Sequence, residues 1–129
     1  MRAISLNCRG LGNPETILEL HYFVKKEAPQ MVFLMETHLP IWKLEFIRVW
    51  FGMKGCFGVE RDGYGGGLAL LWDDTVDVHV QSFSKHHIDS WVNSHYGEVW
   101  RFTGFYGNPI TACRRYIFLG VTVAVKGDE

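Results

Sequence analysis

Polar side chains follow several apolar runs of this sequence at points where strands are predicted to end. Asn7 and Glu36 each come directly after a short apolar run. Tyr106 and Asn108 come after a later alternating stretch. Ligands of α/β sheets gather at strand carboxyl ends, and Mg²⁺ prefers a few protein oxygens together with waters and a substrate phosphate. Spacing alone still favours the ordinary interpretation, in which Asn7 caps a turn and Glu36 is a solvated strand end.

The elements that must position these residues begin with two strand–helix steps. Asn13 and Pro14 form a helix start, because Asn caps free backbone N–H groups and Pro suits the first helical position. Apolar residues then recur at helical spacing. The pattern predicts a strand at Ala3–Leu6, a helix from Pro14 to about Glu27, a fully covered strand at Met31–Met35 and a helix from about Ile41 to Trp50.

Alternating and short apolar runs dominate the rest of the chain and predict antiparallel strands. These runs are Cys56–Val59, Leu68–Trp72, Val76–Val80, Ile88–Val92 and Val99–Tyr106, with a further helix predicted at Arg114–Leu119. The glycines from Gly63 to Gly67 lack the pattern of a phosphate loop, which favours a hairpin connection or bulge. We therefore predict an α/β sandwich with a mixed, mostly antiparallel sheet and flanking helices.

Composition narrows the function classes. The 129 residues carry a formal net charge of −1, so a broad basic surface for nucleic acid is absent and any such contact must be local or through a metal ion. No apolar stretch is long enough for a signal peptide or a membrane span. We expect a soluble intracellular protein, in the nucleus or cytoplasm, without a membrane partner.

Cysteines and histidines offer weaker candidates. Three widely spaced cysteines predict free thiols and no structural zinc site. His86, His87 and His95 are expected to be ordinary surface or turn histidines, because adjacent strand residues point to opposite faces. His38 is a possible residue lining the site. Arg114 and Arg115 suit a nucleic-acid backbone and an exposed helix start equally well.

Four ordered blocks resemble a known family. They are Ser5–Pro14 (SLNCRGLGNP), Phe33–Thr37 (FLMET), Gly66–Trp72 (GGLALLW) and Trp100–Pro109 (WRFTGFYGNP). Together they resemble the endonuclease/exonuclease/phosphatase domains of plant LINE-type (non-LTR) retrotransposons, over residues 1–115. Residues 116–129 are predicted to be a divergent C-terminal tail. Leu6 stands where the family usually has Trp, a change expected to affect packing and not chemistry.

The resemblance implies a magnesium-dependent hydrolase acting on DNA. The position of Glu36 is a direct ligand of Mg²⁺ (or Mn²⁺), and that of Asn7 helps to hold the metal. The position of Tyr106 lies against the substrate phosphate, and Asn108 belongs to the same catalytic loop. The metal would polarise the phosphoryl oxygen, while an Asp would activate water and a His would stabilise the developing charge.

The second half of the family's catalytic set does not occur in this sequence. It contains neither an Asp-x-Asn pair nor an Asp-His pair. Gly127-Asp128-Glu129 follows an apolar run and is the nearest approach to the first motif, but coincidence is the favoured explanation. We expect a truncated and inactive nuclease-like domain with a vestigial metal site and weak or absent DNA binding.

Two alternatives stay open. The chain is an active phosphodiesterase completed by another chain, or it is a non-enzymatic binding or oligomerisation module. We also expect the front sheet to lack its partner sheet, which would expose an apolar face including some of Trp72, Phe102 and Val76–Val80. Such a face predicts self-association and marginal stability.

Overall fold

A computed structural model describes residues 2–61, 63, 65–106 and 121–126, without the side chains of 121–126. Two helices and eight strands make up this part of the chain. In order they are β1 (Ala3–Asn7), α1 (Pro14–Glu27), β2 (Met31–Met35), α2 (Ile41–Trp50), β3 (Gly55–Val59), β4 (Leu68–Trp72), β5 (Val76–Phe83), β6 (His87–Ser94), β7 (Val99–Phe105) and β8 (Val121–Lys126).

The first sheet has the strand order β1-β2-β4-β3. β1 and β2 run parallel, whereas β4 is antiparallel to both of its neighbours. Every residue of β2 is at most 1% exposed, because this strand is covered on both faces. The prediction of a fully covered strand at Met31–Met35, made from its continuous apolar run, is therefore confirmed.

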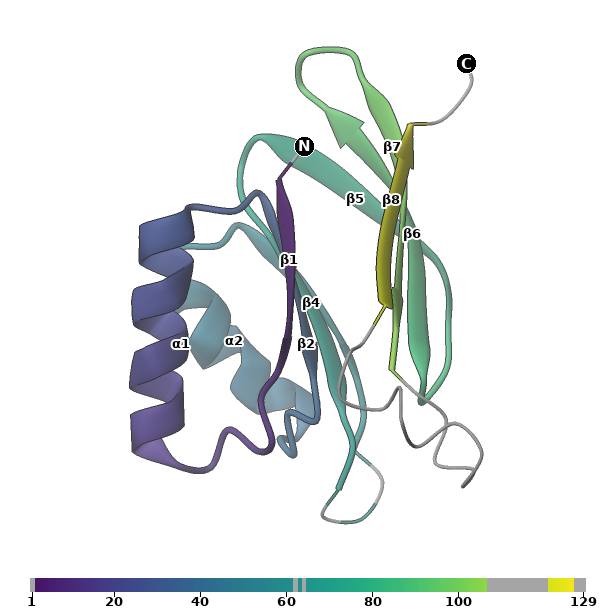
Figure 1. Ribbon diagram of the computed structural model, residues 1–129. Helices are drawn as coiled ribbons and strands as arrows, with labels where there is room; N and C mark the ends of the chain where they lie inside the picture. Colours follow the sequence, from purple (N-terminus) through teal and green to yellow (C-terminus); the bar gives the residue numbers. More distant parts are fainter. Residues whose placement is uncertain (1, 62, 64, 107–120, 127–129) are drawn as a thin grey trace.

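Both helices cover one face of the first sheet (Figure 1). Asn13 caps α1 by accepting a 2.9 Å hydrogen bond from the backbone N–H of Glu15, and Pro14 occupies the first helical position. α1 buries Leu20 and Val24, and both belong to the apolar cluster beneath the helices. The helices begin and end where the sequence pattern predicted.

The second sheet has the order β5-β6-β7-β8, with every neighbouring pair antiparallel. It stacks against the face of the first sheet that the helices leave open (Figure 1). Its inward side chains include Val76, Ile88, Val92 and Phe102, all of them buried in one apolar cluster with residues of β2 and β4. The predicted α/β sandwich with flanking helices is confirmed.

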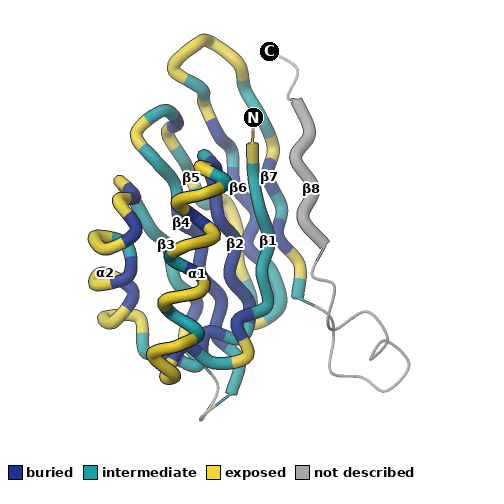
Figure 2. The backbone as a smooth tube through the Cα atoms, turned by 60° about the vertical axis from the view of Figure 1, so that its left-hand side comes forward, coloured by how far each residue is buried: buried dark blue, intermediate teal, exposed yellow. Residues whose placement is uncertain are grey.

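The expectation of an uncovered front sheet is wrong. Phe102 is fully buried and Val76 is 2% exposed, and Trp72 packs at the edge of the same cluster. The backbone of β7 approaches β2 closely, since a Cβ added to Gly104 would lie 2.6 Å from the Phe33 ring. The chain supplies its own second sheet, so the face predicted to cause self-association lies inside the molecule (Figure 2).

β8 pairs with β7 from Val121, opposite Phe105, to Lys126, opposite Trp100. The last residue of β8, Lys126, therefore lies at the opposite end of β7 from Tyr106. The boundary predicted at residue 115 and the helix predicted at Arg114–Leu119 lie outside the described residues, as does Asp128. Neither helix of the described chain has the length and apolar character needed to cross a membrane.

Candidate functional site

Asn7 and Glu36 lie at the same end of two neighbouring parallel strands. Asn7 is the last residue of β1 and stands opposite Met35, the last residue of β2. Glu36 follows Met35 directly. Parallel pairing in this register brings the carboxamide and the carboxylate to one edge of the sheet.

Backbone hydrogen bonds hold the segment around Glu36 from two sides. On one side, the Gly10 N–H donates to the Glu36 carbonyl at 2.7 Å, and the Leu11 N–H donates to that of Thr37 at 2.9 Å. On the other side, the Thr37 N–H donates to the Gly67 carbonyl at 3.2 Å. Glu36 adopts a positive φ of 52°, a conformation uncommon for residues other than glycine that persists only where its surroundings enforce it.

The glycine-rich segment has a second role that its sequence did not indicate. It joins the antiparallel pair β3 and β4, as predicted, and its last residue also contacts the Glu36 segment. Gly67 has a φ of +92°, and a Cβ there would lie 2.4 Å from the Thr37 Oγ1. Only glycine leaves room for this approach.

Tyr106 meets Glu36 directly. Its hydroxyl donates a hydrogen bond to the Glu36 Oε1, and its backbone N–H donates to the His86 carbonyl at 2.7 Å. Burial, this hydrogen bond and the charge of the Glu36 carboxylate all raise the pKa of Tyr106 above its ordinary range. The phenol therefore stays protonated and acts as a hydrogen-bond donor at neutral pH.

Cys8 lies close to the same carboxylate, but its thiol is expected to be unreactive at neutral pH. Burial and the charge of Glu36 raise the pKa of the Cys8 thiol to about 12. A thiol at neutral pH is a poor nucleophile and a poor metal ligand, because both roles need the thiolate. Cys8 therefore serves the apolar packing beneath the site.

Asn7 uses only part of its hydrogen-bonding capacity. Its Oδ1 accepts a 3.0 Å hydrogen bond from the Arg9 N–H, as in a turn-capping asparagine. Its Nδ2 is buried and has no hydrogen-bond partner. Buried polar groups are normally satisfied, and because this Nδ2 is a donor it would be satisfied by an acceptor such as water or a phosphate oxygen, not by a cation.

The donor set fits a hard divalent cation only as a partial site. Within the described ranges, no three His, Cys, Asp or Glu side chains gather closely enough to hold a metal ion. Glu36 offers a carboxylate whose Oε1 alone receives the Tyr106 hydroxyl, and Asn7 offers a carboxamide oxygen with a second lone pair. Mg²⁺ accepts such a set, since it keeps several waters and binds few protein oxygens.

A cavity of about 260 Å³ is lined in part by Tyr106. It is lined by Lys85, His86, Glu60 and the glycines 65–67. The His86 Nδ1 is buried without a hydrogen-bond partner, whereas His87 contacts Ser84 at 2.6 Å. Both histidines were predicted to be ordinary surface or turn residues, and the structure places His86 in the lining of this cavity.

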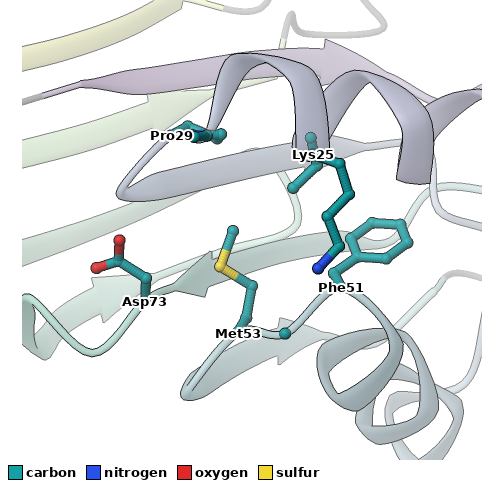
Figure 3. A pocket seen from close by; sticks show the side chains of 8 residues that line it. Lys25, Pro29, Phe51, Met53 and Asp73 are labelled. Carbon is teal, nitrogen blue, oxygen red and sulfur yellow. The ribbon is translucent and has the colours of Figure 1, made fainter.

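A second cavity of about 180 Å³ lies at the opposite end of the first sheet. Figure 3 shows Lys25, Pro29, Met53 and Asp73 around it. The Asp73 carboxylate already accepts hydrogen bonds from the N–H and hydroxyl of Thr75, at 2.9 and 2.6 Å. This cavity is therefore remote from Glu36, and the Oδ1 of its one carboxylate, Asp73, already accepts two hydrogen bonds.

Part of the predicted site lies beyond the described chain. Asn108 and the Arg114–Arg115 pair fall in residues 107–120, outside the described ranges. Of the predicted site residues, the structure brings Glu36 and Tyr106 into contact and places Asn7 at the neighbouring strand end. His38 lies over Gly10, where an added Cβ would be 2.8 Å from its Nδ1.

Comparison with known proteins supports the fold. No protein-family model matches the chain, and no curated protein does. Among solved structures, the crystal structure of the AP endonuclease LMAP from Leishmania major is similar, with a TM-score of 0.54 and 15% identity. The match covers 83% of this chain but 40% of that structure, so the chain spans about two fifths of its length. The chain therefore shares the fold of that structure, over part of the extent seen there.

Proposed function

We propose that these residues form one half of a metal-dependent phosphodiester-cleaving site. The observation that carries the proposal is the hydrogen bond from the Tyr106 hydroxyl to the Glu36 carboxylate. These residues are 70 positions apart, and each directly follows a strand of a different sheet. A protonated phenol beside a carboxylate pairs a phosphate-oxygen donor with a metal ligand.

In this proposal, Glu36 and Asn7 hold Mg²⁺ or Mn²⁺ through their side-chain oxygens. The cation, when bound, would act as a Lewis acid that polarises a phosphoryl oxygen of DNA. When substrate binds, Tyr106 would turn its one hydroxyl hydrogen from Glu36 to the substrate phosphate and so orient that phosphate by a hydrogen bond. Asn108, two residues further on, is proposed to belong to the same loop.

The 129 residues alone are proposed not to cleave DNA. They contain no Asp-x-Asn or Asp-His pair, so the groups that would activate water and stabilise developing charge are missing from this sequence. Catalysis depends on interactions made in the transition state, and a metal-binding half supplies only some of them. The motifs that resemble plant LINE-type domains support a retrotransposon origin and a vestigial site.

A nicking assay on supercoiled DNA with Mg²⁺ or Mn²⁺ tests this function. The chain and its Glu36→Ala variant are expected to give the same background nicking. Robust cleavage by the chain that disappears in Glu36→Ala would instead support the active alternative. In that case another chain supplies the missing groups, and mixing experiments with active-site variants would locate them.

A further inference from the structure

α2 is apolar on both of its faces. Leu44 and Ile47 point into the core and are 1% and 5% exposed. Trp42, Phe46 and Val49 follow the spacing i, i+4, i+7 and are 64%, 68% and 65% exposed. A surface helix normally presents polar and charged residues on the side away from the core, whereas α2 also presents this apolar stripe there. The outer stripe of α2 is therefore unexplained by the fold of one chain.

α1 extends this stripe into a broader surface. Leu18 and Tyr22 are 57% and 70% exposed on α1. The ring of His21 stacks on that of Trp50 with centroids 4.5 Å apart, which ties the two helices together. We call this surface the helical apolar face, made of Leu18, Tyr22, Trp42, Phe46, Val49 and Trp50.

The size of this face matches what a stable dimer needs. Its four aromatic residues are 44–70% exposed, which at about 150–250 Å² for each side chain leaves roughly 400–600 Å² of accessible aromatic surface. Soluble monomers seldom expose contiguous apolar patches larger than a few hundred Å². Adding Leu18, Val49 and a polar rim brings the face close to the ~800 Å² that each partner buries in a standard interface.

The face combines exposed apolar side chains with a groove. A groove of about 290 Å³ runs between the helices, with Leu11, Leu39 and Ile47 among the residues that line it. Trp42 and Phe46 also line this groove and are 64% and 68% exposed. An isologous two-fold contact requires one surface to offer projections and matching recesses together.

Charge on the two helices favours a second copy over an anionic partner. α2 carries both signs, and Arg48 pairs with Glu45 at 2.9 Å. Lys43 lies 5.4 Å from the centre of the Trp42 ring, so its charge is already directed to that ring. α1 likewise exposes both signs of charge, including Glu19 and Lys26, so the two helices present no net basic surface to nucleic acid or an anionic membrane.

We propose that the helical apolar face is the interface of a homodimer, in which α2 of one chain packs against α2 of its two-fold mate. Phe46 lies at the middle of the exposed stripe, and Trp42 lies one turn away beside the groove. In an antiparallel pairing of α2 helices, the Phe46 rings meet near the axis. This interface lies on the helices and does not depend on the proposed metal site.

Sedimentation equilibrium across a dilution series tests the dimer. The chain is expected to reach the mass of two copies on concentration. Phe46→Asp should weaken dimerisation by roughly a hundredfold or more, because aromatic anchors dominate interfaces and each dimer carries the change twice. The matched control is Tyr96→Asp, at an 84% exposed position in the β6–β7 turn, which should dimerise like the unsubstituted chain.

Two further measurements keep the proposal falsifiable. Far-ultraviolet circular dichroism of Phe46→Asp should match the parent chain, because a 68% exposed side chain contributes little to the core. Val49→Glu provides a second disruption on the same stripe and should also give monomers. A parent chain that stays monomeric at every concentration would overturn the proposal, as would monomers that float with anionic vesicles or a dimer that both substitutions leave intact.

Discussion

The hydroxyl of Tyr106 donates a hydrogen bond to the carboxylate of Glu36 and so joins the end of β7 to the end of β2. This contact ties the two sheets together at the edge where Asn7 also lies. Burial, and after it this contact, raises the pKa of Tyr106, and the hydrogen bond orients the carboxylate. The contact therefore has consequences for stability as well as for the proposed function.

Tyr106→Phe removes the donor while it keeps the ring. Hydrogen bonds to charged groups contribute more than neutral ones, so the free energy of unfolding should fall by about 1–2 kcal/mol. Urea denaturation followed by tryptophan fluorescence measures this loss. An unchanged midpoint would mean that water replaces the phenol at no cost and that the contact does not hold the sheets together.

The approach of Gly67 to the Glu36 segment predicts a sharp contrast between two glycines. Gly67→Ala forces a side chain into a left-handed conformation and against Thr37, so it should destabilise the fold by roughly 1–3 kcal/mol. Gly65→Ala is the matched control, because a Cβ there meets nothing within 4 Å. Equal thermal stabilities for the two variants would contradict the packing described here.

Packing between the sheets is tested at Gly104. Gly104→Ala places a Cβ against the Phe33 ring and should cost about 1–3 kcal/mol of stability, as overpacked cores do. Phe33→Leu creates room, so the double variant should lose less than the sum of the two single losses. Strictly additive losses would show that the sheets do not meet at these residues.

The buried thiol of Cys8 predicts a dependence of stability on alkaline pH. Its pKa rises from an ordinary value of 9.0 to about 12 in the folded chain, mainly through burial. Between these values the unfolded chain loses the proton and the folded chain keeps it, so stability falls as pH rises from 9 to 12. Cys8→Ala should flatten this fall, although Tyr106 contributes with the same sign. A slope unaffected by the substitution would contradict the assignment.

Local signals made much of the fold predictable. The Asn13-Pro14 start defined α1, and the apolar run Met31–Met35 defined the central strand, because capping and burial patterns are properties of neighbouring residues. The position of the second sheet was harder to predict. Short apolar and alternating runs identified β5, β6 and β7, whereas β8 lies in residues predicted only as a divergent tail. Alternation also does not state which surface a strand covers, so the expectation of an exposed face at Phe102 was wrong.

The candidate site depended on contacts that no short pattern encodes. Strand ends and the family resemblance pointed to Asn7, Glu36 and Tyr106. The contact between Glu36 and Tyr106 spans 70 residues, and the support from Gly67 arises from a third segment. Neither can be derived from spacing, because each requires the two sheets to be assembled first.

Metal binding at Glu36 tests the central claim most directly. Titration of Mn²⁺, followed by water proton relaxation, measures binding without requiring catalysis. The chain is predicted to bind Mn²⁺ at a single site, and Glu36→Gln should weaken this binding about tenfold or more. Glu98→Gln makes the same change of charge in the β6–β7 turn and should leave the affinity unaltered. Absence of binding by the chain, or equal binding by Glu36→Gln, would contradict the proposed half-site.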